Sequence, residues 1–141
     1  MLPRLLHFPE ERLRPPGAGS PSSVSETTNG RVGKVEAASA ATGQMGQHYL
    51  AAGSRVAMRL WDEQPASEGK PEAARDYETV GYVIAGRARL RTEDQTLELG
   101  PGDSWVVPAG VRHTYEILEA FTAVEATSPP ARQAGRDAPP A

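Results

Sequence analysis

The chain has 141 residues, which is enough for one domain with a single hydrophobic core. It carries 15 Lys and Arg against 18 Asp and Glu, and the formal net charge of −3 gives no electrostatic signature of a nucleic-acid partner or an anionic membrane surface. No cysteine is present, which excludes disulfides, thiolate nucleophiles and cysteine metal sites, while 14 glycines and 13 prolines favour a turn-rich, all-β chain.

Residues 1–30 are predicted to form an N-terminal arm that is flexible or partly docked. The stretch 14–29 is rich in Pro, Gly, Ser and Thr, a composition that buries too little apolar surface to become ordered. Leu5, Leu6 and Phe8 could instead pack on the folded domain. The chain has no run of ~20 apolar residues and no signal-peptide apolar region at its start, so we expect no membrane partner and a cytoplasmic location.

The segment 31–128 is predicted to be the folded domain, built from short strands. The expected strands cover residues 31–35, 44–50, 53–61, 78–85, 87–91, 96–99, 104–107, 111–118 and 120–127. Residues 62–75 are polar and are expected to form a long loop. Short strands between Gly and Pro turns, with almost no helical period, predict an antiparallel sandwich or barrel. Residues 129–141, rich in Pro and Ala, are predicted to be a disordered tail.

One pattern is specific enough to indicate a family. Gly102, Pro108, Gly110 and His113 follow the spacing G-x5-P-x-G-x2-H, with turn residues on both sides of a short apolar strand. This spacing resembles the second conserved motif of the cupin superfamily. The resemblance implies a small single-domain, RmlC-like jelly-roll β-barrel with antiparallel strands and a site in its mouth. It implies little about activity, because this fold hosts many unrelated functions.

The first cupin motif is degenerate in this chain. Cupins commonly place two histidines and a glutamate there, and these bind Mn, Fe, Ni or Zn together with the histidine of the second motif. Counting back from the glycine that closes the motif, the ligand positions hold Thr79 with Ala73 and Arg75 for one spacing, or with Glu72 and Ala74 for the other. No histidine occupies any of these positions, so we predict that the barrel holds no metal cofactor.

An atypical metal site is the alternative. Asp76 and Glu78 lie near the degenerate positions, and either could reach His113 if a β-bulge changed the alternation of side chains. His48 could approach the same place from an earlier strand. Such a site would make the chain a metal-dependent enzyme, a dioxygenase, isomerase or lyase that uses Mn, Fe, Ni or Zn.

The residues predicted to bind a ligand lie near the two motif regions. They are His113, Arg75, Tyr77, Thr79 and Tyr115. Polar groups that converge in a barrel mouth are the default hypothesis for a binding site, and the guanidinium of Arg75 could clamp a carboxylate or phosphate. The leading hypothesis is therefore metal-free binding of a small molecule, with an anion as one option. A structural or interaction barrel without a ligand is the third hypothesis, and no catalytic residue is assigned.

The expected partner on the outside of the barrel is a second copy of the chain. Small jelly rolls leave sheet edges and apolar outer faces that need covering, and a two-fold homodimer is the commonest solution. Trp61 and Tyr82 are expected on this outer face. Arg87, Arg89 and Arg91 alternate along one strand and are expected to form a solvated face.

Overall fold

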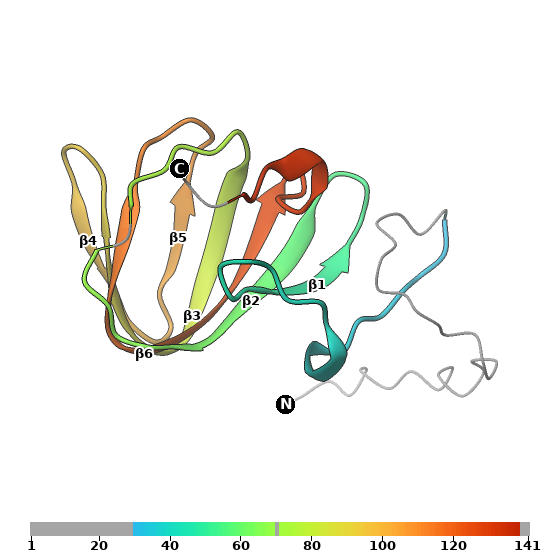
Figure 1. Cartoon of the computed structure of the whole chain (residues 1–141), viewed down its shortest axis with the longest axis horizontal. Coiled ribbons are helices and arrows are strands. Elements are labelled where there is room, and N and C mark those ends of the chain that lie inside the picture. Colours follow the sequence, from blue (N-terminus) through green and yellow to red (C-terminus); the bar gives the residue numbers. More distant parts are fainter. Residues whose placement is uncertain (1–29, 70, 139–141) are drawn as a thin grey trace, which may run out of the picture.

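The computed structural model describes residues 30–69 and 71–138, and its body is one curled antiparallel sheet (Figure 1). The strands are β1 (His48–Ala52), β2 (Ala57–Gln64), β3 (Glu78–Arg91), β4 (Thr96–Leu99), β5 (Ser104–Val107) and β6 (Thr114–Ser128). Hydrogen-bonded neighbours follow the order β1-β2-β6-β3-β4, and β5 also pairs with β3. The predicted antiparallel all-β fold is confirmed. Two short 3-10 helices, η4 (Ala37–Ser39) and η5 (Gln133–Gly135), flank the sheet in the sequence.

The two long strands β3 and β6 bend together, and this bend curls the sheet. Gly86 in β3 has a φ of +87°, and a Cβ at this position would clash with the carbonyl of Ala120 in β6. The register between these strands shifts around the bend, which changes the alternation of side chains. Before the bend odd-numbered residues such as Val83 are buried, and after it even-numbered residues such as Ala88 and Leu90 are buried.

The hydrophobic core lies on the concave side of the curled sheet. Its buried members are Val83, Ala88, Leu90, Leu99, Trp105, Val107, Ile117, Phe121 and Ala123. The ring of Trp105 lies directly over Gly81, where a Cβ would clash with the indole. A glycine at this point of β3 therefore lets a large aromatic ring lie against the backbone of the sheet.

The predicted strands correspond best to the observed ones in the second half of the chain. Residues 96–99 and 104–107 are β4 and β5. The strands predicted at 78–85 and 87–91 form the two halves of β3, and those predicted at 111–118 and 120–127 correspond to the two halves of β6. The strand predicted at 31–35 is wrong, because these residues form no strand and are exposed. The two strands predicted after it begin later than expected.

The long segment between β2 and β3 crosses the start of β6 rather than standing free. Ser67 pairs with Ile117, and Ala73 pairs with His113, each as an isolated antiparallel bridge. The segment is irregular, as predicted, but these bridges hold it over one end of the sheet. The structure thereby brings the two motif regions next to each other.

The residues after Ser128 fold back onto the barrel, beside the end of β6 and the start of β2 in Figure 1. Ala131 is buried, and Asp137 is only 7% exposed. The prediction of a disordered tail is therefore corrected for the described residues 129–138, and the physical reason is a polar network described below. The predicted arm lies outside the described residues except for Gly30. No helix in the described part of the chain is long and apolar enough to span a membrane.

Candidate functional site

The concave side of the sheet contains a cavity of about 390 Å³ that is partly open to solvent. Aromatic side chains form much of its wall, namely Trp61, Tyr77, Trp105, Tyr115 and Phe121. Its volume falls in the range of small-molecule sites, which are mostly apolar with a few placed polar groups. Trp61 was expected on the outer face and is corrected to the inside, because β2 turns its odd-numbered residues, including buried Ala57 and Arg59, toward the cavity.

All five residues predicted to bind a ligand line this cavity. They are His113, Arg75, Tyr77, Thr79 and Tyr115. Backbone hydrogen bonds bring their segments together: Ala73 and His113 exchange two N–H···O bonds of 3.0 Å. The N–H of Gly110 donates to the carbonyl oxygen of Arg75 at 2.7 Å. The positions of the degenerate first motif therefore face the histidine of the second.

His113 presents a hydrogen-bond acceptor to the cavity. Its Nδ1 lies 2.9 Å from the carbonyl oxygen of Val111. Since a carbonyl oxygen can only accept, Nδ1 carries the proton in the neutral ring and Nε2 keeps its lone pair. No hydrogen-bond partner of Nε2 is found among the described residues. The ring stands edge-on to Tyr115, with centroids 5.5 Å apart, and this contact fixes its orientation.

Thr79 and Tyr115 add two hydroxyl groups to the same cavity. Thr79 is buried in β3, and in the described part of the chain its hydroxyl has no hydrogen-bond partner. The Nε1–H of Trp105 donates to the Tyr115 hydroxyl at 3.1 Å, which leaves the phenolic proton to be donated elsewhere. Burial raises the pKa of Tyr115, so the group remains a donor at neutral pH.

A buried arginine, which was not among the predicted site residues, lies at the centre of the polar part of the cavity. Arg59 Nε donates to Glu125 Oε1 at 2.6 Å, and Nη1 donates to Asp137 Oδ1 at 2.7 Å. Trp61 Nε1 donates to the same glutamate oxygen at 2.9 Å. Burial lowers the pKa of Arg59, but the neighbouring carboxylates outweigh it and raise the pKa well above its ordinary value. The arginine is therefore a permanent cation held by two carboxylates.

Asp137 receives four hydrogen bonds from the barrel. Gln47 Nε2 and the Tyr49 hydroxyl donate to Oδ2 at 2.7 and 2.9 Å. Arg59 Nη1 and the Tyr77 hydroxyl donate to Oδ1 at 2.7 and 3.0 Å. Burial alone would raise the pKa of the Asp137 carboxyl, but the charge of Arg59 and the hydrogen bonds lower it. Burial raises the pKa of Tyr49 and of Tyr77 to about 12, so both phenols are donors.

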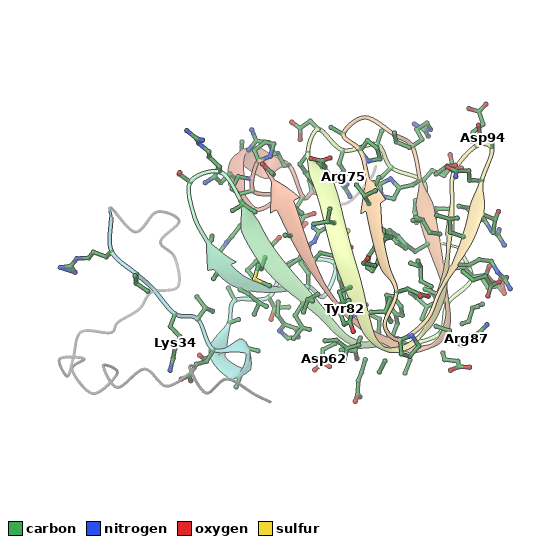
Figure 2. The ribbon with its side chains drawn as sticks, turned by 180° about the vertical axis from the view of Figure 1, so that it is seen from behind. Lys34, Asp62, Arg75, Tyr82, Arg87 and Asp94 are labelled. Atoms are coloured by element: carbon green, nitrogen blue, oxygen red, sulfur yellow. The ribbon has the colours of Figure 1, made fainter. Side chains whose placement is uncertain are left out.

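Arg75 holds the C-terminal segment rather than an open position in the cavity. Its Nη1 donates to the carbonyl oxygens of Arg136 and Ala138 at 3.3 and 2.6 Å. Figure 2 shows Arg75 near one end of the barrel, with Tyr82 toward the opposite end. The Arg75 guanidinium, which was predicted to clamp an anionic ligand, is therefore already engaged by backbone carbonyls.

The residues of the atypical metal site do not come together with His113. Glu78 is exposed on the face opposite Tyr77 and Thr79. The carboxylate of Asp76 is exposed and lies 3.5 Å from Arg136 Nε. His48 in β1 pairs with Leu60 in β2 and does not line the cavity. No three His, Asp or Glu side chains are grouped as a metal site within residues 30–69 and 71–138. The residues present do not fit the metal-ligand set of the first motif.

Two of the residues that sequence reasoning missed had a detectable signal. Arg59 alternates in phase with Ala57 and Trp61, and Glu125 lies directly opposite it in the β2–β6 register. A charged pair at inward positions of two strands indicates a buried ion pair, since a lone buried charge is costly. Asp137 lay in a Pro- and Ala-rich stretch and had no such signal.

Comparisons with known proteins agree with this architecture. The sequence profile of the cupin domain matches residues 59–125. None of the curated proteins matches the chain significantly. An RmlC-like cupin from Shewanella frigidimarina is 20% identical with a TM-score of 0.62, over 73% of this chain and 95% of that one. KdgF from Halomonas sp. is 20% identical with a TM-score of 0.55, over 60% and 79%.

A third similar structure is the DMSP lyase DddQ from Ruegeria pomeroyi. It is 20% identical with a TM-score of 0.51, over 67% of this chain and 54% of that one. At these identities, the similarity shows the fold alone, and the cavity residues must be interpreted from their own chemistry.

The lowered pKa of Asp137 gives a prediction about acid stability. A carboxyl whose folded pKa is depressed contributes stability above its unfolded pKa, and this contribution is lost as pH falls through the folded value. At pH 7, Asp137→Asn should lower the free energy of unfolding by about 1–3 kcal/mol, because buried donors lose a charged acceptor. The gap to wild type should shrink as the pH falls below about 4, as measured by urea unfolding.

Asp94→Asn, on the exposed β3–β4 hairpin, is the matched control and should change stability by less than about 0.5 kcal/mol at either pH. A gap between wild type and Asp137→Asn that stays constant down to pH 3 would contradict the assignment.

Proposed function

Because the chain is a cupin-domain protein with an open, aromatic-walled barrel, we propose that it binds a small molecule in this cavity without a metal ion. One observation carries the proposal. Thr79, His113 and Tyr115 turn polar groups into a cavity of about 390 Å³, and in the described part of the chain neither the Thr79 hydroxyl nor His113 Nε2 has a hydrogen-bond partner. Polar groups that line an apolar cavity and have no protein partner are available to a ligand, which supports this proposal.

The hydrogen-bonding character of these groups indicates which functional groups the ligand carries. His113 Nε2 accepts a hydrogen bond, so the ligand carries an O–H or N–H, while the two hydroxyls can donate to a ligand oxygen. Trp105 and Phe121 offer aromatic surface to the body of the ligand. A compact ring with a hydroxyl group meets these requirements.

The enzyme alternative finds less support in the residues. The first-motif positions hold Ala73, Arg75 and Thr79, which do not make a transition-metal set with one histidine. For metal-free acid–base chemistry, His113 would be helped by a carboxylate on Nδ1, but this nitrogen donates to a backbone carbonyl. A lyase among the similar structures does not change this reasoning, because the fold hosts many functions.

Ligand binding is tested with phenol and catechol as probes, which carry a ring and hydroxyl groups. Both should raise the melting temperature saturably and change the tryptophan fluorescence, since Trp61 and Trp105 line the cavity. His113→Ala and Thr79→Val should each weaken binding by about 3–10-fold, the effect of one hydrogen bond.

The control variant is Arg87→Ala, which lies on an exposed face and should leave probe binding unchanged. Binding that is equally strong in His113→Ala and Thr79→Val would place the probes elsewhere and refute the site. The absence of any saturable response would refute the proposed ligand class.

Metal content is tested by elemental analysis of the purified protein, which should contain well under one transition metal per chain. The triple change Ala73→His, Arg75→His and Thr79→Glu should create tight Mn, Fe or Zn binding, because it restores four converging ligands with His113. Stoichiometric metal in the wild type that disappears in Glu78→Ala or Asp76→Ala would overturn the metal-free proposal.

A second copy of the chain is the partner that we propose for the outer face of the sheet. Five large apolar side chains on this face are 40–52% exposed, namely Met58, Val80, Tyr82, Ile84 and Val106. They form a continuous surface, since Val80 pairs with Val106 on one side and with Ala126 on the other, and Ala126 pairs with Met58. A broad apolar face of this kind favours association, and a two-fold dimer covers the same face on both subunits.

Light scattering should therefore give particles of about twice the 15.0 kDa chain mass. Val80→Glu should shift the population to monomers, because it places a charge at the centre of the apolar face. Val32→Glu, at a fully exposed residue outside the sheet, is the control and should leave the dimer intact. Particles of 15 kDa across a dilution series of the wild type would exclude the dimer.

A further inference from the structure

The carboxylate of Asp137 occupies a site built by other parts of the chain. Its four donors come from the segment before β1, from β1, from β2 and from the residue before β3, namely Gln47, Tyr49, Arg59 and Tyr77. Each carboxylate oxygen receives two of the four hydrogen bonds, at 2.7–3.0 Å. Asp137 itself belongs to the C-terminal segment that folds back after β6.

Two of the four donors are held in place by contacts that do not involve Asp137. Gln47 is fully buried, and its Oε1 accepts a hydrogen bond from the Met45 N–H at 3.0 Å, which orients its Nε2. Arg59 is fixed by Glu125 on its Nε at 2.6 Å. The orientation of Gln47 and Arg59 therefore does not depend on Asp137 alone, which is the kind of preorganisation that favours binding of an external anion.

The charges around the site favour an anion of one negative charge. Glu125 neutralises Arg59, and Arg75 nearby has no carboxylate partner within the described residues. With Asp137 in place, the charges of Arg59, Arg75, Glu125 and Asp137 sum to zero. Without Asp137, the net charge of the site is +1. Two oxygens, each facing two donors, match a carboxylate.

The first part of the C-terminal segment is packed on the barrel: Pro130 and Ala131 are buried, and the Ala131 N–H donates to Thr127 Oγ1 at 2.8 Å. From Gln133 onward, the attachments other than Asp137 are polar. Arg75 binds the carbonyl oxygens of Arg136 and Ala138, and Arg136 Nε lies 3.5 Å from the exposed Asp76 carboxylate. Inside η5, Ala134 has a φ of +55°, a left-handed conformation that is unfavourable for a residue with a Cβ. Within residues 133–138, Asp137 is the only buried residue. A stretch with few buried apolar contacts opens at low cost, so Asp137 can leave while Pro130, Ala131 and the barrel stay packed.

We propose that Gln47, Tyr49, Arg59 and Tyr77 form a carboxylate-binding site that Asp137 occupies as an internal ligand. A small monocarboxylate takes the place of Asp137 when the C-terminal segment moves away. Arg59, Tyr77 and Asp137 also line the aromatic cavity, so the body of such a ligand extends toward Trp61 and Tyr77. This site uses different residues from the His113 side of the cavity and does not depend on the ligand proposed there.

The test is chemical rescue of Asp137→Ala by sodium acetate, with sodium chloride at equal ionic strength and neutral acetamide as controls. Acetate should raise the melting temperature of the variant saturably, by about 3–5 °C at ten times its dissociation constant. Wild type should respond several-fold less, because Asp137 already fills the site. Benzoate should bind more tightly than acetate if the ligand body enters the aromatic cavity.

Asp76→Ala is the matched control, since it removes an exposed carboxylate near the same segment, and acetate should not stabilise it beyond wild type. Adding Tyr77→Phe to Asp137→Ala should weaken the acetate response several-fold. An equal response to acetate, chloride and acetamide would overturn the proposal. If Asp137→Ala does not fold in chloride, folding on addition of acetate supports the site, and failure to fold in about 0.5 M acetate overturns it. Neither outcome of the acetate experiment affects the phenol-binding test, which probes the His113 side of the cavity.

Discussion

The buried charge of Arg59 determines how the inside of this barrel is organised. Its guanidinium lies beside the rings of Trp61 and Tyr77, 5.3 and 5.5 Å from their centroids, on the concave face of the sheet. An uncompensated cation in such a place would cost several kcal/mol. The interior therefore has to supply counter-charges, and it does so with Glu125 directly across the β2–β6 ladder and with Asp137 from the end of the described chain.

This requirement also explains why the C-terminal segment is ordered. Its own composition is poor in large apolar residues, and composition alone predicts a mobile tail. The entropy lost on ordering the segment is offset by charge-assisted hydrogen bonds to Asp137 and by burial of residues such as Ala131. The order of the segment is thus a property of the barrel interior, which local sequence does not encode.

The sequence predicted the parts of the structure that depend on local rules. Turn residues such as Gly102 and Gly110 both have positive φ, and they bound a strand that was predicted to the residue. The motif spacing also pointed to Thr79 and His113, and both line the cavity. The alternation of Arg59 with Ala57 and Trp61 was visible in the sequence, but its partners Glu125 and Asp137 lie 66 and 78 residues away, and no local pattern identifies such a pairing.

The residues at the degenerate first-motif positions make contacts other than metal ligation. Ala73 contributes backbone hydrogen bonds to His113, Arg75 binds the C-terminal carbonyls, and Thr79 offers a hydroxyl to the cavity. These side chains supply none of the converging ligands that a transition metal needs besides His113. Glu125 and Asp137 together balance the charges of Arg59 and Arg75, which supports our proposal of a ligand recognised by hydrogen bonds and aromatic contacts. Under the proposal of an internal ligand, an anion would enter this balanced interior by replacing one of the two carboxylates, and Asp137 is the one that lies outside the strands, on the C-terminal segment.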